Sequence, residues 1–282
     1  MLRNFSLTMV LTTLLITVSA QAKSKVLLIS DIDDTIKVSH VLSTAAKISR
    51  AADVTTPFLG MSQLYQLIVN ENSASTKVIY LSNAPDEIGG VPALTLSHQT
   101  FLNFNKFPAG ELLLRDGLFE ENHKLKAIRE LVESEQPQTI IMIGDNGEQD
   151  SEIYEQIKNE YAESGIKMVT FIHQLYSSNS SSFIPDFLEE RGHAIFPGQN
   201  GFATPIEISL QLNDLGLLSI ASVDWMIKNI APHIVAESSF KWDGLEAISF
   251  PSFKDCSDFQ WSRPLLRIDL ADLVKKIERR CN

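Results

Sequence analysis

Short apolar, β-branched runs alternate with helical patterns along the first two thirds of the chain. Four such runs predict buried strands, at residues 25–30, 77–82, 139–143 and 167–173. A weaker run at 112–115 predicts a fifth strand at an edge of the sheet. Strands that alternate with helices are typical of a parallel sheet covered on both faces, so we expect an α/β, Rossmann-like architecture.

Apolar residues recur at helical spacing between the predicted strands. The segments that show this spacing are 60–70, 125–132 and 153–161. After the last predicted strand, helical patterns return at 204–218 and 222–230, and 265–280 predicts a closing amphipathic helix. Basic residues crowd the last turn of that helix. We interpret them as complements of the helix dipole rather than as a site for lipid headgroups.

Polar side chains follow the predicted strands where the strands end. The residues at these ends are Asp31 and Asp33, then Ser82 and Asn83, then Asp145 and Asp150. Lys124 adds a cation at the start of a predicted helix. Because the carboxyl ends of parallel strands share one edge of the sheet, we expect these groups to lie close together.

The acidic residues favour phosphoryl transfer with a divalent cation. Two carboxylates spaced i, i+2 can divide the reaction, one attacking phosphorus and the other handling the leaving-group proton. Crowded carboxylates ~4 Å apart repel one another by about 4 kcal/mol per pair at an effective dielectric constant of ~20. Oxygen ligands favour Mg²⁺, and the sequence offers no His/Cys set for zinc.

These motifs together resemble the haloacid dehalogenase superfamily. The matching elements are Asp31-x-Asp33-x-Thr35, Ser82, Lys124 and Gly144-Asp145-x-x-x-x-Asp150. Within the superfamily, the sequence motifs at 30–37, 80–85 and 143–154 are similar to those of the phosphatidate phosphatase catalytic domain of the actin-patch type, which is related to lipins. The resemblance covers roughly residues 26–173. It implies a haloacid dehalogenase-like fold with a minimal cap.

The resemblance also implies a role for each matching residue. Asp31 is the nucleophile, and Asp33 is the general acid and then the base that activates water. Ser82 and Asn83 bind the phosphoryl oxygens, and Lys124 steadies both Asp31 and the phosphate. The implied Mg²⁺ ligands are Asp31, the main-chain oxygen of Asp33, Asp145 and Asp150.

Three other positions near these motifs are also interpreted. Asn146 stands where many relatives have serine, a conservative departure. Glu148 is interpreted as a solvated loop acid. His98 has no partner visible in the sequence, so we expect it to be structural or exposed.

The ends of the chain carry their own signals. Residues 1–22 combine Arg3, an apolar core at 9–18 and the small-residue site Ala20-Gln21-Ala22, which predicts a signal peptide; a buried helix or a membrane anchor is the alternative. Export would place the protein in the periplasm or outside the cell. No later segment is long enough to span a bilayer.

The mature chain is expected to divide into a phosphatase domain, 23–235, and a C-terminal extension, 236–282. The chain's two cysteines, Cys256 and Cys281, lie in that extension. In an exported protein the pair predicts a disulfide, with two free thiols as the alternative.

The net charge of −11 disfavours nucleic acid as a partner. The resemblance implies an enzyme that hydrolyses phosphatidate to diacylglycerol at a membrane surface. Two alternatives stay open: a phosphomonoesterase acting on a soluble or protein-borne phosphate, and a non-catalytic module that binds lipid or phosphate.

Overall fold

The computed structural model describes residues 25–43, 50–72, 76–87, 89–117, 120, 122–178, 191–237 and 267–279. Six parallel strands form its sheet: β1 (Val26–Ser30), β2 (Thr76–Pro85), β3 (Glu111–Arg115), β4 (Thr139–Asp145), β5 (Lys167–His173) and β6 (Asn200–Phe202). The predicted signal peptide and the predicted disulfide between Cys256 and Cys281 lie outside the described residues.

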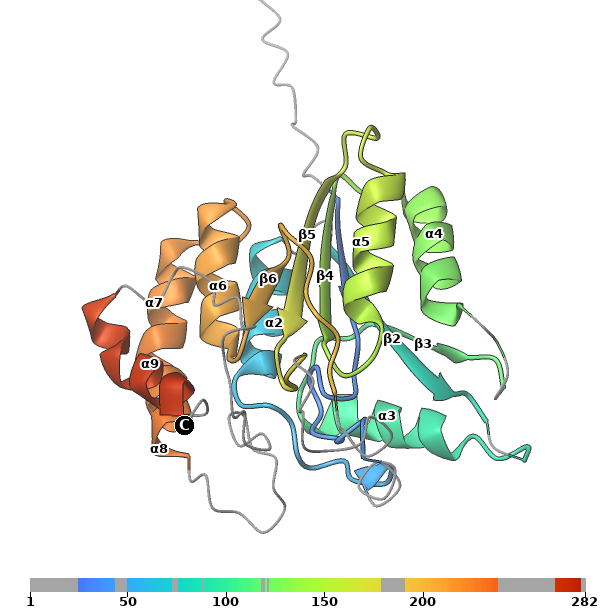
Figure 1. Cartoon of the computed structure of the whole chain (residues 1–282), viewed down its shortest axis with the longest axis horizontal. Coiled ribbons are helices and arrows are strands. Elements are labelled where there is room, and N and C mark those ends of the chain that lie inside the picture. Colours follow the sequence, from blue (N-terminus) through green and yellow to red (C-terminus); the bar gives the residue numbers. More distant parts are fainter. Residues whose placement is uncertain are drawn as a thin grey trace, which may run out of the picture.

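The strand order is β3-β2-β1-β4-β5-β6, a doubly wound arrangement (Figure 1). The chain leaves β1 toward one edge of the sheet and returns through β4 toward the other. The carboxyl ends of β1 and β4 therefore flank the point where the winding reverses, where open α/β sheets bind ligands. The predicted α/β fold and all five predicted strands are confirmed. The sequence did not predict β6, whose three residues are too few for a periodic signal.

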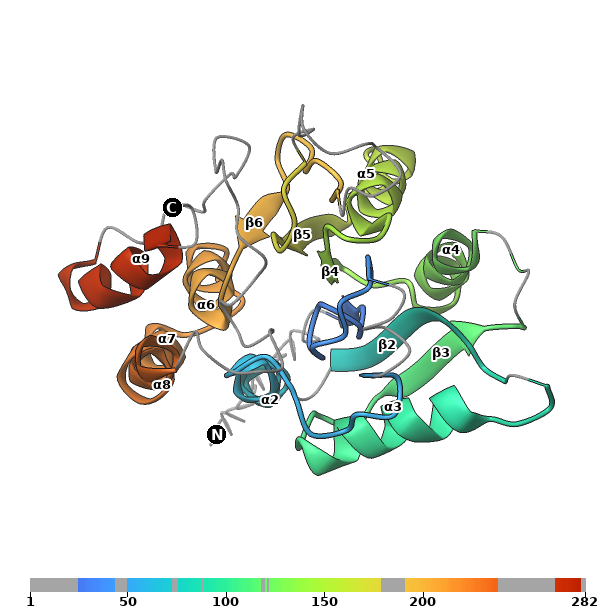
Figure 2. The ribbon, with the colours of Figure 1, turned by 60° about the horizontal axis from the view of Figure 1, so that its bottom comes forward.

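Helices cover both faces of the sheet (Figure 2). The described helices of eight or more residues are α2 (Met61–Glu71), α3 (Ala93–Phe104), α4 (His123–Glu135), α5 (Asp150–Glu160), α6 (Pro205–Asp214), α7 (Ile220–Asn229) and α9 (Ala271–Glu278). The shorter α8 (Ala231–Ala236) follows α7, and a 3₁₀ turn at Ile268–Leu270 precedes α9. Helices α4 and α5 pack on one face, and α2 and α6 to α9 build the opposite side of the molecule. Among the described residues, no helix combines the length and apolar composition needed to cross a bilayer.

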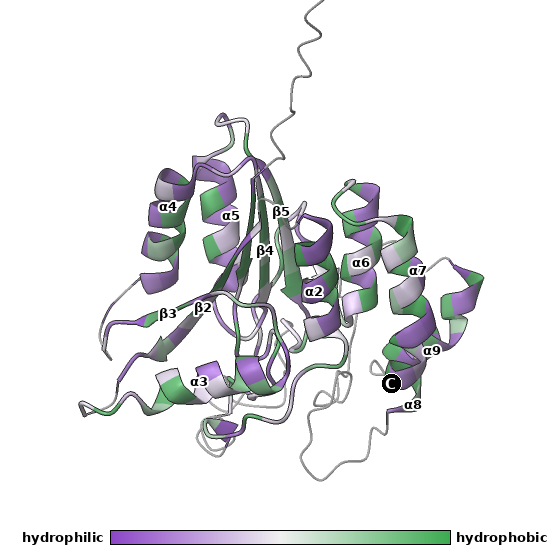
Figure 3. Ribbon diagram, turned by 180° about the vertical axis from the view of Figure 1, so that it is seen from behind, coloured by the Kyte–Doolittle hydropathy of each residue, from purple (hydrophilic) through white to green (hydrophobic). Residues whose placement is uncertain are grey.

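The central strands are buried on both faces, which explains their unbroken apolar runs (Figure 3). In β1, Val26 and Leu28 belong to the core under α2 and α6, whereas Leu27 and Ile29 belong to the core under α4 and α5. Successive side chains of a strand point to opposite faces, so one strand contributes to both cores. The carboxyl end of β1 is thereby held from two sides.

The closing helix α9 joins the larger core through Leu270, Leu273 and Ile277. One of its basic residues has a different role from the predicted one. The Lys276 ammonium donates hydrogen bonds to the carbonyl oxygens of Ile234, at 2.5 Å, and Val235, at 3.2 Å. These carbonyls belong to the last turn of α8, so Lys276 caps a neighbouring helix rather than only complementing the dipole of its own.

Asn146 fixes the loop after β5 to the end of β4. Its buried side-chain amide donates to the carbonyl oxygens of Tyr176, at 2.6 Å, and His193, at 3.3 Å. Its Oδ1 accepts from the backbone N–H groups of Leu175, at 2.8 Å, and Tyr176, at 3.0 Å. All four hydrogen bonds join segments far apart in the sequence, and serine is too short to replace them.

Replacing Asn146 by serine should therefore lower the free energy of unfolding by about 2–4 kcal/mol, because several buried backbone groups lose their partners. Urea denaturation of the purified protein measures this loss. Asn159→Ser is the matched control, since Asn159 is exposed and makes one long bond to Glu155. A loss no larger than that of the control would contradict the assigned role.

Candidate active site

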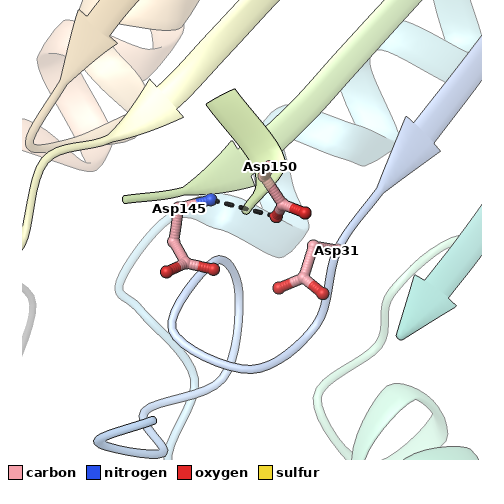
Figure 4. Close-up of side chains that lie close together, drawn as sticks. All are labelled: Asp31, Asp145 and Asp150. Atoms are coloured by element: carbon pink, nitrogen blue, oxygen red, sulfur yellow. Dashed lines mark hydrogen bonds between the residues drawn. The ribbon is translucent and has the colours of Figure 1, made fainter. Parts of the chain in front are cut away.

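Three carboxylates meet at the carboxyl ends of β1 and β4 (Figure 4). Asp31 directly follows β1, Asp145 is the last residue of β4, and Asp150 is the first residue of α5. Each offers an oxygen atom that lies within 4.8 Å of the others. Gly144 makes the approach possible, because a Cβ atom at this position would collide with the Asp150 carboxylate.

Lys124 brings a cation into the same cluster from the first turn of α4. Its ammonium lies 2.8 Å from Oδ1 of Asp31 and 2.5 Å from Oδ1 of Asp150. The other oxygen of Asp31 accepts a hydrogen bond of 2.9 Å from the Thr35 hydroxyl. Both oxygens of Asp31 are thus held in place, and Lys124 is only 1% exposed.

One positive charge does not balance this cluster. Burial and the repulsion of Asp150 and Asp31 raise the pKa of Asp145 well above its usual range. Burial likewise raises the pKa values of Asp31 and Asp150, although Lys124 opposes the rise for both. Such a site favours either protonation or a bound cation.

The hydrogen bonds of Asp145 favour a bound cation over protonation. Its Oδ1 accepts from the backbone N–H groups of Gly147, at 2.5 Å, and Glu148, at 3.2 Å. Its Oδ2 is buried and has no hydrogen-bond partner among the described residues. A buried carboxylate oxygen without a partner, beside two further carboxylates, fits a metal ion with oxygen ligands. The residues present therefore can hold such an ion.

The Asp33 carboxylate lies outside this cluster. It accepts a hydrogen bond of 2.5 Å from the Ser39 hydroxyl, and its Oδ2 lies 3.1 Å from Nε2 of His98. The buried ammonium of Lys37 lies 3.9 Å from its Oδ1. Burial opposes ionisation, but the hydrogen bond and charge of His98, with Lys37 and Ser39, hold the pKa of Asp33 well below its usual range.

The surroundings of His98 fix where its protons lie. Nδ1 lies 2.8 Å from the carbonyl oxygen of Leu94, which can only accept, so Nδ1 carries a proton. Nε2 faces the carboxylate of Asp33, and a hydrogen bond between them needs a second proton. Asp33 and His98 therefore share one proton, held either on the imidazole or on the carboxyl group.

Asp34 shapes the loop that carries Ser39. This buried residue has a positive φ of 60°, and its Oδ1 accepts from the backbone N–H groups of Ser39, at 2.8 Å, and His40, at 2.9 Å. Its Oδ2 accepts from the N–H of Val41, at 2.7 Å, and from the Tyr176 hydroxyl, at 2.6 Å. The loop after Asp33 is thus closed by a side chain of its own, which places Ser39 against Asp33.

The other predicted phosphate-binding residues lie at the end of β2. Ser82 is buried, and its hydroxyl accepts a hydrogen bond of 3.1 Å from the N–H of Ala84. Asn83 donates a bond of 3.0 Å to Glu148, which in turn lies 4.0 Å from the ammonium of Lys124. Glu148 is therefore not the solvated loop acid that the sequence indicated. It links the β2 end to the cluster around Lys124.

Sequence reasoning also missed His98. His98 is buried, so the exposed alternative is wrong, and its contact with the predicted catalytic group Asp33 was not predicted. The sequence gave no local signal for it, since α3 itself was not predicted. The structure brings Asp31, Lys124, Asp145 and Asp150 together, and it places Asp33 beside them with separate partners.

One of the comparisons with known proteins identifies a family. The family model of the phosphatidate phosphatase APP1 catalytic domain matches residues 26–173, a little more than half of the chain. A search of curated proteins finds no match.

One solved structure with a similar chain is the "Structure of the Pnkp1/Rnl/Hen1 RNA repair complex". The identity is 16%, the TM-score is 0.33, and the match covers 53% of this chain and 43% of that chain. With so low a TM-score the likeness carries no argument. The family match includes β1 to β5, Asp31, Asp33, Ser82, Lys124, Asp145 and Asp150. The chain belongs to the family of phosphatidate phosphatase APP1 catalytic domains, and it is a phosphoric monoester hydrolase.

Proposed function

We propose that the protein is a Mg²⁺-dependent phosphatidate phosphatase that works through a phosphorylated Asp31. The observation that carries the proposal is the fixed Asp31 carboxylate, with Lys124 at 2.8 Å on one oxygen and Thr35 at 2.9 Å on the other. The family match supports phosphatidate as the substrate. The export-like segment at 1–22 supports a periplasmic or secreted location.

Each residue has a defined task in this reaction. An oxygen of Asp31 attacks phosphorus, the bond to the diacylglycerol oxygen breaks, and that oxygen takes a proton from Asp33. Water then attacks the phosphorus atom and gives its proton back to Asp33, which releases phosphate and restores Asp31. Lys124 orients Asp31 and offsets charge on the transferring group.

The carboxylates of Asp31, Asp145 and Asp150, with the main-chain oxygen of Asp33, would hold the Mg²⁺ ion. When bound, the ion supplies positive charge that offsets the charge of the phosphoryl oxygens. The unpartnered Oδ2 of Asp145 supports this assignment. Ser82 and Asn83, at the end of β2, are assigned to the phosphoryl oxygens.

Phosphate release from phosphatidate should be seen with the purified protein, and Asp31→Asn should lower it on the order of 10³-fold or more, because the amide cannot attack phosphorus. Circular dichroism checks that the variant folds. Sugar phosphates, nucleotides and phosphopeptides are assayed in parallel. Turnover of one of these without turnover of phosphatidate would contradict the proposed substrate, and a variant that keeps a tenth of the rate would contradict covalent catalysis.

Removal of divalent metal with EDTA should abolish activity, and Mg²⁺ should restore it. A second readout does not depend on activity. Mg²⁺ should raise the midpoint of thermal unfolding, because it binds only the folded site. Asp145→Asn should remove this rise while stabilising the metal-free protein, since it deletes a buried charge whose pKa is raised.

Asp214→Asn is the matched control for this measurement, because Asp214 is an exposed acid at the end of α6. It should keep the full response to Mg²⁺. An Asp145→Asn protein that Mg²⁺ stabilises as much as the wild type would refute the ligand assignment.

The proton shared by Asp33 and His98 should matter most for a leaving group that must be protonated. His98→Gln should therefore lower kcat for phosphatidate by about 10–100-fold. Turnover of p-nitrophenyl phosphate should fall much less, since nitrophenolate leaves without a proton. His233→Gln, at an exposed histidine of α8, should change neither rate. Equal losses on both substrates would mean that His98 only supports the fold.

A further inference from the structure

Helix α3 lies at the edge of the sheet where the strands end (Figures 1 and 2), and its His98 contacts Asp33. The two faces of α3 differ in their contacts. The inner face carries His98, which contacts Asp33, and Phe101, whose ring lies 6.0 Å from the ammonium of Lys37. The outer face is free of these contacts and points away from the site.

The outer face is exposed, and it carries large apolar side chains beside the uncharged polar Gln99, Thr100 and Asn103. Leu96 is 58% exposed and Phe104 is 62% exposed, and the two lie eight residues apart on one side of the helix. Val91, just before the helix, is 57% exposed. These are three of the six large apolar side chains that are exposed among the described residues. Large apolar groups gathered on one surface mark a site of interaction with another apolar surface.

The same segment is free of charge. From Ile88 to Asn105 the sequence contains no Asp, Glu, Lys or Arg, although charged residues make up 21% of the chain. The protein as a whole carries a net charge of −11, so an anionic bilayer repels most of its surface. A stretch without acidic groups, followed by the exposed Lys106, lacks this local repulsion.

We propose that the outer face of α3, formed by Val91, Leu96 and Phe104, is the surface through which the enzyme docks on a lipid bilayer. This inference rests on the proposed function, which needs access to a lipid substrate. Apolar side chains of a surface helix enter the boundary between headgroups and acyl chains, with the helix parallel to the membrane. The inner face of the same helix contacts Asp33 through His98, so docking through the outer face places Asp33 about one helix diameter, ~10 Å, from the membrane surface.

Binding to vesicles tests the surface directly. Wild-type protein should co-sediment with phosphatidylcholine vesicles that contain phosphatidate, and Leu96→Glu combined with Phe104→Glu should weaken that binding about tenfold or more, since two apolar side chains lose their burial. Ile220→Glu is the matched control. Ile220 is 55% exposed on α7, away from α3, and its substitution should leave binding unchanged.

The ratio of two rates separates docking from catalysis. Turnover of vesicle-borne phosphatidate, divided by turnover of p-nitrophenyl phosphate, should fall about tenfold in the α3 variant and stay at the wild-type value in Ile220→Glu. If the protein binds vesicles through α3 but hydrolyses no phosphatidate, the proposed function fails and the docking surface stands. If phosphatidate is hydrolysed but the α3 variant binds and turns over like the wild type, only the docking surface fails.

Two further outcomes would overturn the docking surface. Wild-type protein that stays in the supernatant with every vesicle does not dock on bilayers. Wild-type dimers that the Leu96 and Phe104 substitutions dissociate, seen by size-exclusion chromatography, would assign the face to a second copy of the chain. Leu96→Gln with Phe104→Gln repeats the test without added charge, in case the glutamate variant fails to fold.

Discussion

Lys124 and the three carboxylates around it form the interaction on which the site depends. Its buried ammonium donates hydrogen bonds to the buried carboxylates of Asp31 and Asp150. A buried ammonium without these partners would be strongly unfavourable, and so would the carboxylates without the ammonium. The charges nevertheless do not balance, because Asp145 keeps an oxygen without a partner. The remaining negative charge favours a bound cation, and such a cation together with Lys124 would offset the charge of an anionic phosphoryl group.

The order of the strands and a glycine at residue 144 bring these charged groups together. β1 and β4 are adjacent and parallel, so their carboxyl ends deliver Asp31 and Asp145 to the same point. The close approach of Asp150 is possible because residue 144 has no side chain. Buried strands with apolar residues on both faces hold this geometry rigidly, since each strand is packed from two sides.

The sequence predicted the parts of the site that depend on strand ends. Asp31, Ser82 and Asp145 stand directly after or within apolar runs, and those runs were readable as strands. It did not predict α3, because apolar residues occur on both faces of that helix and blur the helical period. The hydrogen-bond partners of Asp33 and Glu148 could not be predicted from the sequence either. His98 lies 65 residues from Asp33 in the chain, and only the folded structure brings them into contact.

Asp33 and Asp31 illustrate how environment separates two similar carboxylates. Burial raises the pKa of Asp31, whereas His98, Lys37 and Ser39 overcome burial and lower that of Asp33. One carboxylate is held by a lysine and a threonine in a position to attack, and the other shares a proton with an imidazole. These directions are opposite to the two proposed roles. In the proposed reaction a bound cation therefore keeps Asp31 ionised for attack, and the proton that Asp33 delivers is the one it shares with His98.

A phosphorylated Asp31 is the central claim, and trapping it is the most direct test. The protein is mixed with phosphatidate and Mg²⁺, quenched in acid during turnover, reduced with borohydride and digested for mass spectrometry. The account predicts that residue 31 is recovered as homoserine, the product of reducing an aspartyl phosphate, and only when substrate was present. Rapid phosphate release with an unmodified Asp31, or with the modification at another residue, would contradict it.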